Sequence, residues 1–214
     1  MGDRASDPLP PQHALAYGAR VSEYAAFNDD RAFAVPLLDR LGALLHPGAV
    51  VVDLGCGPGW ETEALQRRGF QAIGLDVTSE FVALAARGHP ATGYVVGEFG
   101  ALPFGDRVLD GAWACSSLVH VPWSGIDQAL AEIARVLRPG GVFFASMQAG
   151  STEGLNASRT FPDALFHYAY YEPEEWRARL TGAGFVVDWL NYHDAAPEHC
   201  NPGAHGWIES VARV

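Results

Sequence analysis

The chain has 214 residues, 49% of them hydrophobic, which predicts a single folded unit with one sizeable core. Asp and Glu total 25 against 14 Lys and Arg, a formal charge of -11, and such a surface repels a nucleic-acid backbone unless basic residues cluster, which they do not. All 14 of these basic residues are arginines. Because the chain has no lysine, Schiff-base chemistry on lysine and the phosphate-binding lysine of a P-loop are excluded.

The three cysteines, Cys56, Cys115 and Cys200, are far apart in the chain and odd in number. That usage is typical of a reducing compartment, and we expect a cytoplasmic protein. No stretch approaches the roughly 18 consecutive apolar residues of a membrane span, so no membrane partner is expected. Residues 1–13 are polar and proline-rich and are interpreted as a flexible tail before one domain over residues 14–214.

Residues 14–45 precede the first predicted strand. Apolar side chains recur there at helical spacing and predict a pair of helices. Tyr17 and Tyr24 are seven residues apart and therefore share one helix face.

Beyond residue 45, short apolar runs alternate with helical patterns, and glycine or proline marks many of the boundaries. The predicted strands are 50–54, 72–75, 93–96, 111–114, 142–146, 185–190 and 207–214, and the predicted helices are 61–68, 79–87, 125–137 and 173–181. This order predicts an α/β fold with a doubly wound, mainly parallel seven-stranded sheet and helices on both faces. Ligands of such folds bind at the carboxyl ends of the strands.

The most informative stretch follows the first strand, which ends at Asp53 and leads into Gly55, Gly57 and Gly59. Glycines at alternate positions let the backbone turn tightly and approach a ligand closely. A dinucleotide-binding fingerprint would need a third glycine at position 60, where this chain has Trp60.

The run D-L-G-C-G-P-G resembles the first motif of the class I S-adenosylmethionine-dependent methyltransferases. Residues 97–104 resemble the family's G-D-A-x-x-L-P-F segment, residues 109–121 its fourth strand and following loop, and residues 135–141 its R-V-L-R-P-G-G signature. The resemblance covers residues 17–185 and implies a Rossmann-like methyltransferase fold with S-adenosylmethionine as cofactor.

In that family an acidic residue at the end of the second strand binds both ribose hydroxyls, and Asp76 has this place. Glu98 stands where an aspartate usually accepts the adenine amino group, and Phe99 replaces a usual alanine, so the adenine end departs from the family pattern. The resemblance implies cofactor contacts from Tyr17, Tyr24, Asp53, Gly55, Cys56, Gly57, Gly59, Asp76, Val77, Glu98, Phe99, Ala114 and Cys115.

Two histidines are candidate catalytic bases. His120 falls in the loop after the fourth strand, and His167 lies in an aromatic group that continues to Tyr171. Imidazole is the usual general base near neutral pH, and a structural or packing role is the alternative at both positions. Cys56 is not expected to be a nucleophile, because methyl transfer from a sulfonium needs no covalent enzyme intermediate.

A second group of Cys and His residues lies near the C-terminus, at His193, His199, Cys200 and His205. Their spacing matches no recognised zinc pattern, and no metal site is expected. We interpret the segment as a loop over the active-site mouth.

These observations predict methyl transfer from S-adenosylmethionine to an O, N or C nucleophile of a small molecule, such as an aromatic compound or a natural-product intermediate. Trp60 and Trp123 suggest an enclosed apolar pocket for this acceptor. The N-terminal helices, about residues 14–45, are expected to form a lid. The alternatives are a non-catalytic binder of the cofactor and a nucleic-acid methyltransferase, and either a monomer or a homodimer is compatible with the sequence.

Overall fold

The computed structural model describes residues 12–214. The predicted tail therefore lies, up to residue 11, outside the described residues, and Gln12 already belongs to the first helix, α1 (Gln12–Gly18).

The predicted seven-stranded sheet is confirmed. Its strands are β1 (Val50–Leu54), β2 (Gln71–Asp76), β3 (Gly93–Val96), β4 (Leu109–Cys115), β5 (Leu137–Ala149), β8 (Val186–Asp194) and β9 (Gly206–Arg213). They lie in the order β3-β2-β1-β4-β5-β9-β8, and only β9 runs against the others. The order reverses between β1 and β4, so a crevice opens at the carboxyl ends of these two strands.

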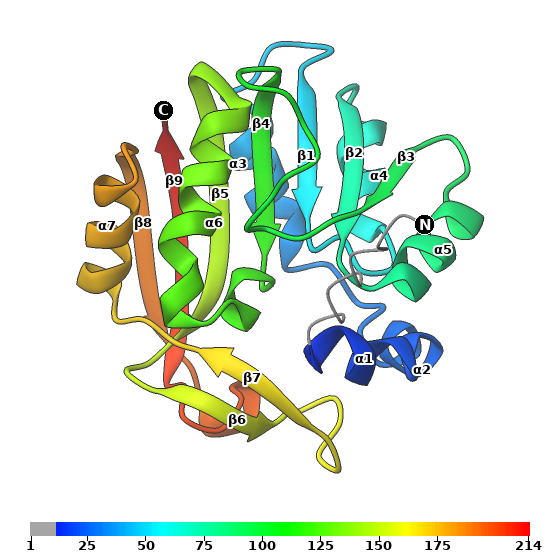
Figure 1. The fold of residues 1–214 in the computed structure, drawn as a ribbon, viewed down its shortest axis with the longest axis vertical. Coiled ribbons are helices and arrows are strands. Elements are labelled where there is room, and N and C mark those ends of the chain that lie inside the picture. The colour runs from blue at the N-terminus through cyan, green and yellow to red at the C-terminus, as the bar shows by residue number, and fades with distance from the viewer. Residues whose placement is uncertain (1–11) are drawn as a thin grey trace, which may run out of the picture.

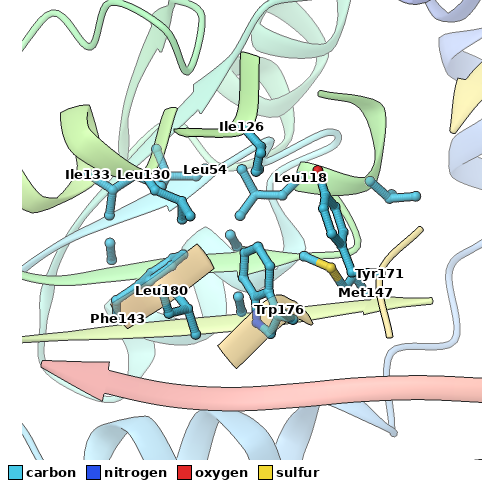
Figure 2. Close-up of a cluster of buried hydrophobic side chains, with 14 of the residues drawn as sticks. Leu54, Leu118, Ile126, Leu130, Ile133, Phe143, Met147, Tyr171, Trp176 and Leu180 are labelled. Atoms are coloured by element: carbon cyan, nitrogen blue, oxygen red, sulfur yellow. The ribbon is translucent and has the colours of Figure 1, made fainter. Parts of the chain in front are cut away.

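Helices cover both faces of the sheet (Figure 1). The helices behind it in this view include α3 (Ala34–Gly42) and α4 (Trp60–Arg67), and those in front are α6 (Trp123–Val136) and α7 (Pro173–Gly182). Figure 2 shows the core on the α6 and α7 side, where Leu118, Ile126 and Trp176 pack against Phe143 and Met147. A second buried cluster places α3 against the opposite face. Both faces of the central strands β1, β4 and β5 are thus mostly buried, which explains their nearly continuous apolar runs.

Residues 12–45 hold three helices, so the predicted pair is wrong. After α1 come α2 (Val21–Phe27) and α3, with α5 (Ser79–Gly88) packed against the first two. Asn28 ends α2 by donating from its side chain to the Tyr24 carbonyl, and Asp30 accepts the N–H of Ala32. Such side-chain bonds to the backbone favour turns over helix.

A hairpin that the sequence analysis did not predict follows β5. It consists of β6 (Glu153–Ala157) and β7 (Leu165–Ala169), which pair only with each other. Figure 1 shows it at the end of the sheet where β1 and β4 end, on the side opposite α1 and α2. The hairpin and the first two helices therefore flank the crevice.

The boundary between α6 and β5 also differs from the prediction. Leu137, predicted as the end of the helix, pairs with Leu109 as the first residue of β5. Among residues 12–214, no helix is both long and apolar enough to cross a membrane.

Candidate active site

The loop after β1 adopts a conformation that only glycine takes without strain. Gly55, Gly57 and Gly59 have φ angles of 77°, 50° and 88°, in the left-handed region. A Cβ atom on Gly55 would lie 2.4 Å from the Cβ atom of Ser117. The alternate glycines thus permit both the turn and the close approach of the loop after β4.

Asp76, at the end of β2, fixes this loop. One carboxylate oxygen accepts the N–H of Gly57 at 2.9 Å and the other accepts the N–H of Thr78 at 2.8 Å. Burial raises the pKa of Asp76, while the bonds from Thr78 and Gly57 oppose the increase.

The crevice contains a cavity of about 480 Å³, a size typical of small-molecule sites. It extends from the glycine loop to the β6–β7 hairpin. Eleven of the predicted site residues line it: Tyr17, Tyr24, Gly55, Gly57, Asp76, Val77, Glu98, Phe99, Cys115, His120 and His167.

Four residues predicted to contact the cofactor do not line the cavity. Ala114 is fully buried, and the Cys56 side chain is directed toward Gly74. Gly59 has Tyr94 and Ala85 packed over its α-carbon. These three residues, in the glycine loop and in β4, hold the backbone in place. The fourth residue that does not line the cavity is Asp53.

Asp53 is buried beneath the loop and accepts a hydrogen bond of 2.6 Å from the Thr62 hydroxyl. Burial raises its pKa to about 8, and the negative charge of Glu61 adds to the increase. Glu61 in turn forms an ion pair with Arg31, from the segment between α2 and α3. This cluster ties the N-terminal region to the first turn of α4.

Asp53→Asn is expected to change how stability depends on pH. A carboxyl whose folded pKa exceeds its unfolded value binds protons more tightly when folded, so its contribution to stability falls as the pH rises from about 4 to 8. Asparagine does not titrate and can still accept from Thr62. The melting temperature of the variant relative to the parent should therefore increase between pH 5 and pH 9. If the difference in melting temperature between variant and parent stays constant over this range, Asp53 is not protonated in the folded protein.

Tyr17 and Tyr24 pack edge to face with ring centroids 5.5 Å apart, but they lie on two helices, α1 and α2, so the predicted shared face of one helix is wrong. Both rings also contact Phe81 of α5 and Phe161 from the connection between β6 and β7. Burial raises the pKa of both tyrosines, that of Tyr24 to about 12, so both hydroxyls stay protonated at neutral pH.

The two candidate bases lie side by side. The Nδ1 atom of His120 is 2.8 Å from the main-chain oxygen of His167, and its Nε2 atom is 3.2 Å from the Tyr17 hydroxyl. Because a carbonyl can only accept, Nδ1 carries the hydrogen and Nε2 of neutral His120 has a lone pair. This geometry suits proton acceptance at the cavity.

The C-terminal Cys and His residues do not line the cavity, contrary to the predicted loop over its mouth. His193 is in β8, His199 is in a short helical turn, and Cys200 is buried. Within the described part of the chain, no group of three or more His, Cys, Asp or Glu residues is arranged to hold a metal ion. Trp60 and Trp123 are likewise absent from the lining.

Comparison with known proteins identifies the family. Residues 52–145 match the family model described as a methyltransferase domain. The chain is 32% identical over 185 residues to a malonyl-[acyl-carrier protein] O-methyltransferase of Erwinia billingiae, an alignment that covers 78% of this chain and 72% of that enzyme. The chain belongs to the class I S-adenosylmethionine-dependent methyltransferases.

Solved structures agree with this assignment. This chain is 25% identical to 1,6-didemethyltoxoflavin-N1-methyltransferase of Burkholderia thailandensis, which was solved with 1,6-didemethyltoxoflavin and S-adenosylhomocysteine. The two structures superpose with a TM-score of 0.68 over 97% of this chain and 92% of the other. The methyltransferase also shares its fold with the [4+2]-cyclase SpnF, at 21% identity and a TM-score of 0.73 over 94% of each chain. The fold alone therefore does not specify the reaction.

The residues present fit the family's cofactor. A Cβ atom at Gly55 or Gly59 would collide with a neighbouring side chain, so only glycine allows this loop to pack as it does. The Asp76 carboxylate lies beside the loop, at the carboxyl end of β2, and lines the same cavity. Cys115 also lines this cavity, but burial raises the pKa of its thiol to about 12, so it is not a thiolate nucleophile at neutral pH.

Sequence reasoning missed about half of the lining. Ser116 has a φ of 57°, and this strained backbone follows β4 directly. No local sequence pattern indicates such a conformation in serine, and the hairpin residues belong to an element that was not predicted. The missed residues are Thr78, Phe81, Gly97, Gly100, Ser116, Ser117, Val121, Pro122, Gly125, Gln128, Leu155 and Leu165.

Proposed function

We propose that this methyltransferase transfers a methyl group to an uncharged small molecule bound between the glycine loop and the β6–β7 hairpin. The observation that supports this most strongly is the composition of the cavity described above, which joins the cofactor motifs to an apolar end with Tyr17 and His120. A carboxylate and glycine loop suit a nucleoside, and the apolar end suits the body of an acceptor.

At the cofactor end, Asp76 accepts from the ribose hydroxyls, and Glu98 accepts the adenine amino group. Gly55 and Gly57 let the backbone approach the amino-acid part, and Val77, Phe99 and Cys115 supply contact surface. Asp53 acts from beneath the loop, where its carboxyl is 2% exposed. Bound S-adenosylmethionine supplies a methyl group activated by the sulfonium.

At the acceptor end, the protein's task is to hold the nucleophile in line with the bond that breaks, and positioning of this kind contributes several kcal/mol, about 7 to 11 in favourable cases. Leu155 and Leu165 of the hairpin, with Val121, surround the acceptor. Nε2 of His120 receives the proton of a hydroxyl or amine acceptor, and the His167 ring forms part of the same wall.

The charge of the lining favours an uncharged acceptor. Among the described residues, those that line the cavity include Asp76 and Glu98 but no arginine. A malonyl group, which the names of the curated relatives specify, ends in a carboxylate, and the described residues of the lining add no cationic side chain for it beside the sulfonium of the bound cofactor. Since the Arg31 guanidinium is paired with Glu61, we favour an acceptor other than malonyl.

We propose further that α1 and α2 form the lid, without α3, which packs in the core through Leu37, Leu38 and Leu41. Hydrogen exchange in residues 14–31 should slow when S-adenosylhomocysteine binds, because the ligand would pack beneath Tyr17 and Tyr24. Exchange in α3 should not change and serves as the internal control. Unchanged exchange in residues 14–31 would mean that these helices only pack on the sheet.

A screen for methyl acceptors tests the proposed function. The protein is incubated with methyl-labelled S-adenosylmethionine and a metabolite library of phenols, amines and carboxylic acids, together with a malonyl-loaded acyl-carrier protein. Label in an uncharged small molecule supports the proposal. Label only in carboxylates, either the library acids or the malonyl carrier, would overturn the proposed uncharged acceptor, and ligand binding without any labelled product would favour the non-catalytic alternative.

A further inference from the structure

Glu153, the first residue of β6, joins three elements through one carboxylate oxygen. Its Oε1 atom accepts the main-chain N–H of Trp123 at 2.8 Å and lies 3.1 Å from Nε2 of His167. Trp123 is the first residue of α6, so the negative charge also lies at the amino end of a helix of 14 residues. Both the free N–H group and the helix dipole favour a carboxylate there.

The main chain of His167 connects the Glu153 contact to His120. His167 lies opposite Leu155 in the hairpin, and its main-chain oxygen accepts the Nδ1 hydrogen of His120 at 2.8 Å. His120 ends the short helical turn η1 (Leu118–His120), against which β7 packs. The position of β7 therefore determines whether this carbonyl reaches the imidazole.

These contacts favour opposite tautomers of the two histidines. A carbonyl cannot donate, so His120 carries its hydrogen on Nδ1. The Glu153 carboxylate, 3.1 Å from Nε2 of His167, favours a hydrogen on that nitrogen. The Nδ1 atom of His167 is buried and has no hydrogen-bond partner among the described residues, which suits a nitrogen without a hydrogen.

We propose that Glu153 is a positioning residue of the acceptor site, which holds His167 and strand β7 so that His120 keeps its hydrogen on Nδ1 and presents Nε2 toward Tyr17 and the cavity. Glu153 does not itself line the cavity and is not a catalytic residue. The inference rests on the proposed role of His120 in acceptor deprotonation, but its structural part is testable without an acceptor.

Tautomers of individual histidines are measured by long-range proton–nitrogen correlation spectra of protein with nitrogen-15 in histidine, without ligand. The His120 signals are assigned by their loss in His120→Asn. In the parent, His120 should show the Nδ1–H pattern and His167 the Nε2–H pattern. A parent His120 in the Nε2–H form would overturn the inference at once.

Two substitutions at position 153 separate positioning from simple helix capping. Glu153→Ala removes the hydrogen bond from Trp123 and the contact with His167, and the His120 nitrogens should shift toward the averaged values of two exchanging tautomers. Glu153→Gln keeps an oxygen that accepts from Trp123 and faces Nε2 of His167, and it should preserve the Nδ1–H form. If His120 is unchanged in Glu153→Ala, the His167 carbonyl is held without Glu153 and the inference fails.

Glu172→Ala is the matched control, because Glu172 lies 3.0 Å from Nε2 of His205 outside the cavity. This variant should alter the His205 signals and leave those of His120 in place. A His120 shift of equal size in Glu172→Ala would show a general loosening instead of a specific contact.

Activity gives the second readout. With the acceptor identified by the screen, Glu153→Ala should lower kcat by about tenfold, because the base loses its fixed orientation. The dissociation constant of S-adenosylhomocysteine should remain within about twofold, and Glu153→Gln should restore kcat. If the tautomers respond as expected but His120→Asn keeps full kcat, the proposed base is wrong while the positioning contact stands.

Discussion

Asp76→Ala is expected to weaken S-adenosylhomocysteine binding by about ten- to a hundredfold. Hydrogen bonds to a charged acceptor contribute about 1.5 to 3 kcal/mol each, and water replaces part of the loss when the carboxylate is removed. Asp76 lines the cavity at the end of β2, beside the glycine loop. Isothermal titration calorimetry with the parent and the variant measures the change in dissociation constant.

The same substitution should also lower the stability of the protein without ligand. The position of Asp76 at a strand end suggests little effect on melting, but its carboxylate accepts the N–H groups of Gly57 and Thr78. Leaving buried donors unpaired costs about 1 to 3 kcal/mol. Affinity must therefore be measured below the melting range of the variant.

Asp39→Ala is a suitable control for Asp76→Ala, because Asp39 is 64% exposed and forms a surface ion pair with Arg68. Such pairs contribute little to stability, and binding should remain unchanged in this variant. A folded Asp76→Ala protein that binds the ligand as tightly as the parent would show that Asp76 is not the ribose ligand.

His120→Asn is expected to reduce kcat by about a hundred- to ten-thousandfold for an acceptor that must lose a proton. The asparagine amide can still donate to the main-chain oxygen of His167, which preserves the contact made by Nδ1. It offers no nitrogen lone pair in place of Nε2. Steady-state kinetics with the identified acceptor measure the effect, and affinity for S-adenosylhomocysteine should change little.

His193→Asn is the matched control for His120→Asn, since His193 is exposed in β8 and does not line the cavity. Its kcat should equal that of the parent. Full activity of His120→Asn at all pH values would show that no proton is transferred to this imidazole and that the histidine has a packing role.

The sheet was predictable because its signals are local. Apolar runs such as Val50–Leu54 are buried on both faces, and the glycines after β1 have positive φ angles that the sequence pattern itself requires. The cofactor end of the cavity was predictable from the family resemblance, which places Asp76 at the end of the second strand.

The acceptor end was much harder to predict. The β6–β7 hairpin contains Gly154, Asn156 and His167 in short strands that pair only with each other, so neither strand carries a strong pattern. Its importance comes from contacts distant in sequence, such as the bond between His120 and the His167 carbonyl across 47 residues. Periodicity also cannot show that Asp53 lies beneath the loop instead of at the cavity surface.

Calorimetric titration of the parent protein with S-adenosylhomocysteine, and separately with NAD, tests the central claim most directly. One site per chain for S-adenosylhomocysteine and no heat from NAD is the result that the glycine loop and Asp76 predict. Binding of NAD without binding of S-adenosylhomocysteine would contradict the assignment of this cavity to a methyltransferase cofactor.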